Sequence, residues 1–216
     1  MCPSTRDLLI VEQNPSLEQW KQIDELCCRT GNGGEPIARE RWNFFSHVWV
    51  SPYQRLRPSW TYFMQAPGVG VVGYLTGCPD TSSYYTDYRL KVLPGLILEA
   101  LIRAPREKDA RNFLRRLLRV DPTPESSFQS GLRLRLKKEF PAHLHINFDP
   151  AYRGRGAGAE LIEAYCEDLK RQGVTGLHLF CGKGPLGFYF RAGFIELAKV
   201  EFRPGVWVYA LGKKIA

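Results

Sequence analysis

The chain has 216 residues, 44% of them hydrophobic, and a formal net charge of +8. Its length suits one domain of ordinary size. No apolar run approaches the ~20 residues that a membrane-spanning helix needs, and the N-terminal residues lack the apolar core of a signal peptide. No pair among the six cysteines has CxxC spacing, which predicts free thiols rather than disulfides or a zinc site. We therefore expect a cytosolic or nuclear protein with no membrane partner.

The first half of the chain predicts a strand, two helices and a β-hairpin. The capping box of Ser16 and Gln19 marks the start of the first helix, and Pro52 limits the second, aromatic-rich one. In chain order the predicted elements are a strand at residues 6–12, a helix from 16 to about 31, a helix at 40–50, and hairpin strands at 60–64 and 69–76.

Residues 79–140 predict a helical and basic segment. We expect a helix from residue 91 or 94 to residue 103, a firmer helix at 105–120, a loop at 121–127 and an extended segment at 132–137. Eleven basic and five acidic residues lie between positions 101 and 140, a net charge of +6. This excess fits a solvated helix face, attraction of an anionic ligand, or a nucleic-acid or acidic-protein surface.

The stretch from residue 146 to residue 169 is the most informative part of the sequence. An apolar run stops at Asp149, glycines follow at alternate positions from Gly154, and an amphipathic helix then begins. This order places unbonded main-chain N–H groups at a helix N-terminus, where an anion can bind. The helix dipole and the side chains of Arg153 and Arg155 add positive charge. We interpret the loop as a pyrophosphate cradle; the alternative is a strand–turn–helix corner with glycines for tight packing.

The spacing of the glycines distinguishes among nucleotide-binding motifs. It does not meet Gly-x-Gly-x-x-Gly, and no Gly-Lys-Ser/Thr sequence is present. It fits Arg/Gln-x-x-Gly-x-Gly/Ala, read here from Arg153 to Gly158, which resembles the acetyl-CoA motif of the GNAT superfamily of N-acetyltransferases. About 35 residues later, Phe188-Tyr-x-x-x-Gly193-Phe is similar to the second GNAT signature, a short helix that ends on glycine.

The resemblance implies an α/β (α+β) GNAT fold over residues 1–216. Its central sheet is mixed and mostly antiparallel, with a splayed strand pair and flanking helices. The segment at about 79–140 is then a helical insertion between the third and fourth strands. The runs 51–53, 73–80 and 140–146 are similar to one GNAT branch, which includes the C-terminal acetyltransferase-like domain of the O-GlcNAc hydrolases.

The same resemblance implies that acetyl-CoA is the cosubstrate and lies in the wedge between the fourth and fifth strands. Tyr189 aligns with the tyrosine that commonly faces the CoA sulfur as general acid. The asparagine that often precedes the second signature is absent, and Lys183 either replaces it or is a solvated loop lysine. The expected cofactor-binding residues are Asn147, Phe148, Arg153, Gly154, Arg155, Gly156, Ala157, Gly158, Ala159 and Phe188.

An amine acceptor must lose a proton before it attacks a thioester. His143 and His145 lie two residues apart on the predicted fourth strand, so their side chains share one sheet face. An imidazole suits proton removal at neutral pH. Structural histidines with a bound water as base, or Glu99, are alternatives; Asp149 is more typical of a turn.

The expected acceptor is a primary amine, either on a small molecule or on a protein lysine. Aromatic residues of the first half either line its pocket or form core; these are Trp42, Phe44, Phe45, Trp49, Tyr53 and Trp60. Two other functions stay open, a GNAT-fold binding module without turnover, such as a chromatin reader, and a nucleic-acid binder that uses the basic insertion. A homodimer is left open as the assembly.

Overall fold

The computed structural model describes residues 11–119 and 127–215. These residues contain a seven-stranded sheet in the order β1-β2-β3-β4-β5-β7-β6. The strands are β1 Glu12–Gln13, β2 Thr61–Ala66, β3 Gly70–Cys78, β4 Ala142–Phe148, β5 Gly176–Cys181, β6 Ile195–Arg203 and β7 Val206–Lys214. Every neighbouring pair is antiparallel except β4 and β5, which run parallel. The predicted mixed, mostly antiparallel sheet is confirmed.

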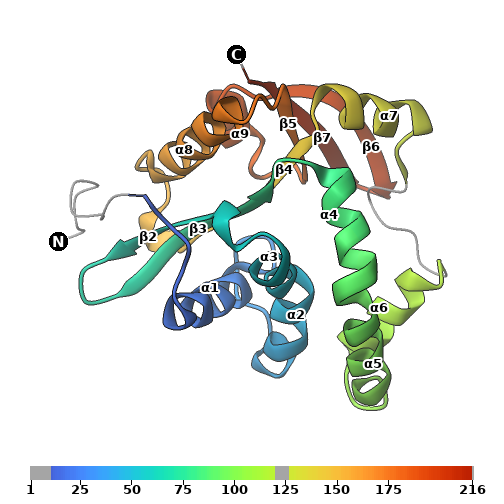
Figure 1. The fold of residues 1–216 in the computed structure, drawn as a ribbon. Helices are drawn as coiled ribbons and strands as arrows, with labels where there is room; N and C mark the ends of the chain where they lie inside the picture. The colour runs from blue at the N-terminus through green and yellow to red at the C-terminus, as the bar shows by residue number, and fades with distance from the viewer. Residues whose placement is uncertain (1–10, 120–126, 216) are drawn as a thin grey trace.

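Helices cover both faces of this sheet (Figure 1). Before β4 they are α1 Leu17–Thr30, η2 Arg39–Arg41, α2 Trp42–Trp49, α3 Ser51–Leu56, η3 Pro58–Trp60, α4 Thr81–Asp87, η4 Tyr88–Val92, α5 Leu93–Arg103, α6 Lys108–Leu117 and α7 Ser130–Glu139. After β4 they are η6 Pro150–Tyr152, α8 Ala157–Arg171 and α9 Leu186–Arg191. No helix of the described ranges is both long and apolar enough to cross a bilayer.

The N-terminal elements follow the sequence patterns closely. Ser16 and Gln19 form the predicted capping box, and α1 ends at Gly31. The second predicted helix corresponds to η2 and α2, and the predicted hairpin to β2 and β3. The predicted first strand lies mostly outside the described residues, which show only Glu12 and Gln13 paired with β2.

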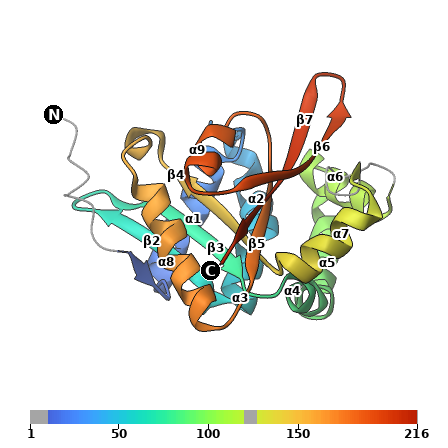
Figure 2. The same cartoon turned by 90° about the horizontal axis from the view of Figure 1, so that it is seen from above.

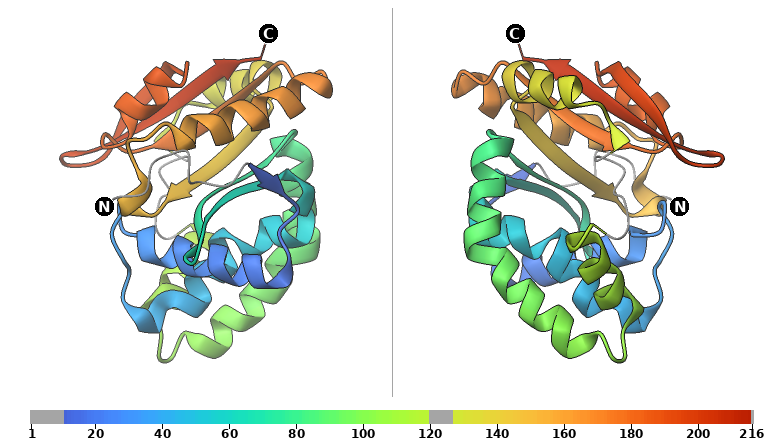
Figure 3. Two further views of the ribbon diagram at one scale, coloured as in Figure 1. Left: turned by 90° about the vertical axis from the view of Figure 1, so that its left-hand side faces the viewer. Right: turned by 90° about the vertical axis from the view of Figure 1, so that its right-hand side faces the viewer.

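The sheet separates two apolar layers. On one face, Trp20, Ile23 and Leu26 of α1 pack on Phe63 and Tyr74 of the sheet. On the other face, α8 packs over β2, β3, β4 and β5 through a larger cluster that includes Leu161, Ile162, Tyr165 and Leu169. Figure 3 shows the two layers from the sides, with α8 on one side of the sheet and α1 and α2 on the other.

The insertion between β3 and β4 is helical, as predicted. Helices α4, η4 and α5 form a nearly continuous rod that extends away from the sheet on the side of α1 and α2, and α6 returns along it (Figures 1 and 3). The firmer predicted helix begins at Lys108 rather than residue 105. The predicted loop at 121–127 lies almost entirely outside the described residues.

The extended segment predicted at residues 132–137 is wrong, because these residues belong to α7. The leucines alternate with basic residues, which suggested a strand, but only Leu136 is buried and Leu134 is 69% exposed. Leu132 and Leu136, four residues apart, share one helical face. Leucine, arginine and lysine all favour helices, and the segment has no β-branched residue.

At its other end the sheet extends into the β6–β7 hairpin, which projects beyond the helices (Figure 2). Helix α9 ends as its motif predicts, with Gly193 at a φ of 86° and Phe194 N–H donating to the Tyr189 carbonyl at 3.0 Å. Strand β6 then starts directly after Phe194.

Candidate active site

Strands β4 and β5 diverge soon after they meet. Their parallel pairing comprises only Ala142 with Leu177 and His143 with His178. Strand β4 nevertheless continues to Phe148 and is paired with β3 from His143 to Phe148. The distal half of β4 therefore has a strand neighbour on one side only. This is the splayed strand pair that the sequence predicts.

The main chain of β4 presents hydrogen-bonding groups to this wedge. Asp149 N–H donates to the Val72 carbonyl on β3 at 2.9 Å. Because hydrogen-bonded pairs alternate along an antiparallel ladder, the main-chain groups of Ile146 and Phe148 face away from β3, toward β5. The Phe148 carbonyl accepts a hydrogen bond from Arg153 Nε at 2.9 Å. The main-chain groups of Ile146 and the N–H of Phe148 thus line the side of β4 that β5 leaves uncovered.

The loop after β4 has the geometry of an anion site. Gly154 and Gly156 have φ angles of 77° and 91°, which side chains other than glycine rarely adopt, and a Cβ on either would meet open space. Within the part of the chain that the structure describes, the main-chain N–H groups of Gly154, Gly156, Ala157 and Gly158 donate no hydrogen bond. Ala159 is different, since its N–H donates to the Gly156 carbonyl at 2.8 Å.

The two arginines of the loop, Arg153 and Arg155, have different surroundings. Arg153 directs its guanidinium backwards, to the carbonyls of Phe148 at 2.9 Å and Gly34 at 3.2 Å. Its charge contributes to the local field, but its Nε and Nη2 groups each donate to a main-chain oxygen. The guanidinium of Arg155 lies 6.0 Å from the Tyr152 ring centroid.

Asp149 forms the turn into the loop, the role typical of its place in the sequence. Its Oδ1 accepts from Ala151 N–H at 3.0 Å, and its Oδ2 pairs with Arg29 Nη1 at 3.0 Å. No sequence signal identified Arg29, because it lies 120 positions from Asp149.

Helix α9 packs against the head of α8. A Cβ on Gly158 would lie 3.0 Å from the Phe188 ring and 3.6 Å from the Phe148 ring. The glycine at position 158 therefore serves close packing between α8, α9 and β4, which is the alternative that the sequence left open for the loop. At positions 154 and 156, by contrast, glycine allows a positive φ and leaves the space beside the main chain free.

Tyr189 lies on α9 with 8% of its surface exposed, between the rings of Phe188 and Phe194. Burial, followed by the nearby Cys181, raises the pKa of its phenol well above the ordinary value of 10. The hydroxyl is therefore protonated at neutral pH. It makes no hydrogen bond to another described residue.

His143 belongs to a buried polar cluster at the closed end of the wedge. Its Nε2 lies 2.8 Å from Tyr53 Oη and its Nδ1 lies 2.8 Å from Thr81 Oγ1. The Thr81 hydroxyl donates to the Pro141 carbonyl at 2.7 Å, so it accepts from His143 Nδ1–H. Nε2 then accepts from the Tyr53 hydroxyl. Burial, followed by the charges of His178 and His145, lowers the pKa of His143 well below its ordinary value.

His145 shares the sheet face of His143, as predicted, but it is exposed to solvent. Its ring centroid lies 5.6 Å from that of Trp49 and 6.1 Å from that of Tyr53, in edge-on geometry. The surrounding protein lowers the pKa of His145, so the ring is neutral at pH 7 while solvent still reaches it. Of the two histidines on β4, only His145 is accessible to a molecule from solution.

Most of the aromatic residues predicted for the acceptor pocket pack within the protein rather than beside His145. Phe44 and Trp60 are buried, and Trp60 packs on Tyr165 in the layer beneath α8. Trp42 donates its indole N–H to the Ile37 carbonyl at 3.1 Å. Phe45 packs on the α1 cluster and contacts Trp49. Trp49, 43% exposed, and the buried Tyr53 are the members of the set that the structure brings to His145.

Two further predicted residues are engaged elsewhere. Asn147 donates through Nδ2 to Tyr74 Oη at 2.8 Å, so its side chain points to the α1 face. Glu99 on α5 pairs with His47 at 3.0 Å and with Arg103 at 2.8 Å, which makes it a structural carboxylate. Lys183 is exposed in the loop before α9.

The excess positive charge of the insertion is spread over α5, α6 and α7. Part of it is neutralised by ion pairs, as between Arg103 and Glu107 at 2.8 Å and between Arg135 and Glu139 at 3.3 Å. In addition, Asp109 binds Arg41 of η2 at 2.6 Å, which fastens α6 to the main body. These pairs are typical of a solvated helical surface.

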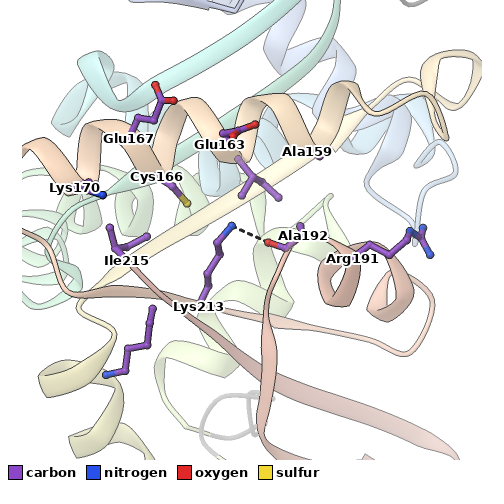
Figure 4. A pocket seen from close by; sticks show the side chains of 11 residues that line it. Ala159, Glu163, Cys166, Glu167, Lys170, Arg191, Ala192, Lys213 and Ile215 are labelled. Atoms are coloured by element: carbon purple, nitrogen blue, oxygen red, sulfur yellow. Dashed lines mark hydrogen bonds between the residues drawn. The ribbon is translucent and has the colours of Figure 1, made fainter.

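A groove of about 470 Å³ lies along the outer side of α8, against α9 and the end of β7 (Figure 4). Its walls mix Glu163 and Glu167 with Lys170 and Lys213, and Lys213 Nζ donates to the Ala192 carbonyl at 2.8 Å. Of the predicted site residues, only Ala159 lines it. The groove starts at the first turn of α8 but contains no group that could transfer a proton at the wedge.

The fold and the glycine loop have counterparts in known proteins. A model of the acetyltransferase (GNAT) family matches residues 129–194, from the start of α7 to the end of the α9 motif. The protein therefore has the GNAT fold, and the segment that carries its glycine loop matches the GNAT family.

Among solved structures, the chain is similar to SsHAT, with 26% identity, a TM-score of 0.71, and coverage of 99% of this chain and 100% of that chain. It is also similar to the ribosomal-protein-alanine N-acetyltransferase of Brucella melitensis, with 14% identity, a TM-score of 0.53, and coverage of 95% and 99%. A third similar structure is yncA of Salmonella typhimurium, solved with its cofactor acetyl-CoA, with 14% identity, a TM-score of 0.52, and coverage of 96% and 94%.

Proposed function

We propose that this protein is an acetyl-CoA-dependent N-acetyltransferase that acts on a primary amine by direct attack in a ternary complex. The main observation in its favour is a set of main-chain N–H groups, those of Gly154, Gly156, Ala157 and Gly158, which donate to no described residue. They lie at the N-terminus of α8, after the β4 strand that diverges from β5. A diphosphate satisfies such donors, and the dipole of α8 adds to the attraction. The GNAT fold and the acetyl-CoA held by yncA support acetyl-CoA as the ligand.

Acetyl-CoA supplies an activated thioester carbonyl. With its diphosphate at the glycine loop, the extended arm of the cosubstrate would follow the uncovered side of β4. The N–H groups of Ile146 and Phe148 face that side and would polarise the carbonyl oxygen, since donors fixed in place stabilise the charge that develops there.

Two side chains would then move protons in opposite directions. As the amine nitrogen forms its bond to the carbonyl carbon, neutral His145 accepts the proton that the nitrogen loses. As the carbon–sulfur bond breaks, Tyr189 donates its proton to the departing thiolate. His145 is reached by solvent whereas His143 has both ring nitrogens engaged, so we assign the base to His145 and a positioning role to His143.

We expect the pH profile of kcat to carry the signature of His145. Because the environment lowers its pKa, the imidazole stays neutral until the pH falls below the ordinary histidine range. Desolvation by the surrounding protein lowers the pKa of His145 to about 4, so wild-type kcat should stay level through pH 6 and fall only as the pH approaches 4, where the base becomes protonated. His145→Gln should lower kcat about 100-fold at pH 7 and remove this acid limb.

His47→Gln is the matched control, because the side chain of His47 is also accessible to solvent but lies on α2 beside Glu99. It should keep the wild-type profile. An acid limb that persists unchanged in His145→Gln would assign the base to another group, such as a bound water.

Two measurements test the proposal as a whole. Isothermal calorimetry should show saturable, stoichiometric binding of acetyl-CoA. When acetyl-CoA and the protein are incubated with a set of primary amines, at least one amine should cause release of free CoA, which a thiol reagent detects. Binding without release from any amine would indicate a GNAT-fold binding module. Absence of acetyl-CoA binding would overturn the proposal.

We also propose that the protein falls in the GNAT branch similar to the acetyltransferase-like domain of the O-GlcNAc hydrolases. The His-x-His pattern on β4 and a helical insertion between β3 and β4 support this assignment. The similarity to SsHAT, which extends over 99% of this chain, is compatible with the assignment but does not itself identify the branch.

A further inference from the structure

Trp49 is placed unusually for a large aromatic residue. It lies at the end of α2 with 43% of its surface exposed, although large apolar side chains gain free energy by burial. One neighbour is Phe45, with ring centroids 6.1 Å apart, and the other is His145 at 5.6 Å. An exposed indole directly beside the proposed base is available to whatever the base deprotonates.

The substrate of such a base arrives with a positive charge, because an alkylamine is protonated at neutral pH. A bound ammonium is stabilised electrostatically by a carboxylate or by the π face of an aromatic ring. Two of the nearby carboxylates are engaged, Glu99 by His47 and Arg103, and Asp87 by Arg57 and Lys91. A third, Asp24 on α1, has a buried Oδ1 without a hydrogen-bond partner among the described residues and interacts electrostatically with His47.

Helical geometry also separates Trp49 from those carboxylates. His47 contacts Glu99, and side chains two residues apart on a helix point to nearly opposite sides. Within the described residues Trp49 contacts the rings of Phe45 and His145, and Tyr53 is a second aromatic neighbour of His145. The surroundings of the base are therefore aromatic rather than acidic.

We propose that Trp49 forms the acceptor subsite of this protein and binds the protonated amine of an alkylammonium group by a cation–π interaction, next to His145. This inference rests on the proposed acetyltransferase function and narrows the acceptor class to alkyl primary amines. The ammonium binds over the indole and releases its first proton to solvent through the neighbouring imidazole. The free amine then attacks, and the imidazole, neutral again, accepts the second proton that the nitrogen loses. A guanidinium or a neutral amide cannot complete that sequence.

The first test is a binding measurement that needs no turnover. The full chain is labelled with 5-fluorotryptophan, and the Trp49 signal is assigned by its loss in Trp49→Phe. We expect n-butylammonium chloride to shift the Trp49 fluorine resonance saturably, and n-butanol, its uncharged isostere, to shift it far less at the same ionic strength. Trp207, 39% exposed on β7, is the internal control and should not respond.

Equal responses to the ammonium and the alcohol, or equal responses of Trp49 and Trp207, would overturn the inference. The second test uses n-butylamine as acceptor. Trp49→Leu should raise its KM about tenfold, whereas Trp49→Phe, which keeps an aromatic face, should raise it less. Trp207→Leu should leave KM unchanged.

Failure of this inference is distinguishable from failure of the proposed function. Acetyl-CoA affinity, measured by calorimetry, should be the same in wild type and in Trp49→Leu. Normal acetyl-CoA binding with no selective response at Trp49 would contradict the Trp49 subsite but not the proposed function. If the wild type does not bind acetyl-CoA, the proposed function is contradicted, whether or not the Trp49 resonance responds to the ammonium.

Discussion

Gly156→Glu is expected to abolish acetyl-CoA binding. Residue 156 has a φ of 91° and immediately precedes α8, and its own N–H and the next two main-chain donors have no partner among the described residues. A glutamate there places a carboxylate among the donors that a diphosphate needs, and it repels the diphosphate itself. We expect at least a 100-fold loss of affinity by calorimetry, with a modest loss of stability from the left-handed backbone, about 1–2 kcal/mol.

The matched control is Gly68→Glu in the β2–β3 turn. Gly68 also has a positive φ, 72°, and a Cβ there also meets open space. It should therefore show the same backbone cost in thermal unfolding while binding acetyl-CoA as wild type does. Gly156→Ala separates strain from charge, and we expect it to weaken binding less than the glutamate. Unchanged affinity in Gly156→Glu would show that the loop is only a packing corner.

Tyr189→Phe is expected to lower kcat about 100-fold, the low end of what a positioned general acid contributes. The change removes one oxygen, and this hydroxyl makes no hydrogen bond to the rest of the described chain. The melting temperature and the affinity for acetyl-CoA should therefore stay close to the wild-type values. Burial raises the pKa of Tyr189, so the acid form should persist throughout the neutral and mildly basic range.

Tyr209→Phe provides the comparison, since Tyr209 is a half-buried tyrosine on β7 opposite Cys181. It should keep wild-type kcat. If Tyr189→Phe also kept wild-type kcat, the thiolate would have to obtain its proton from solvent. A large fall in melting temperature would instead assign the hydroxyl a structural role.

The elements with local signals could be predicted from the sequence. The capping box located α1, and the glycine spacing located the loop between β4 and α8. The alternation of side chains along a strand correctly placed His143 and His145 on one face. In each case the deciding physical interaction joins residues close together in the chain.

The parts that failed or stayed open depend on distant contacts. Alternation at 132–137 suggested a strand, but no sheet edge receives those residues and their helix propensity prevails. The accessibility of His145 and the engagement of His143 follow from Tyr53, Thr81 and the helices around them. The inward direction of Arg153 depends on Gly34, 119 positions away.

The contacts of Arg153 and Arg29 have a consequence for the order of events at the site. Arg153 joins the glycine loop to the Gly34 carbonyl, and Arg29 joins α1 to Asp149. The segment between α1 and η2 leads directly into the helix that carries Trp49. Thermodynamic linkage is reciprocal. A cosubstrate that fixes the glycine loop in one conformation would therefore also restrict the segment between α1 and η2, and so raise the affinity for the amine beside Trp49. These contacts favour ordered and cooperative binding, in which acetyl-CoA binds before the amine.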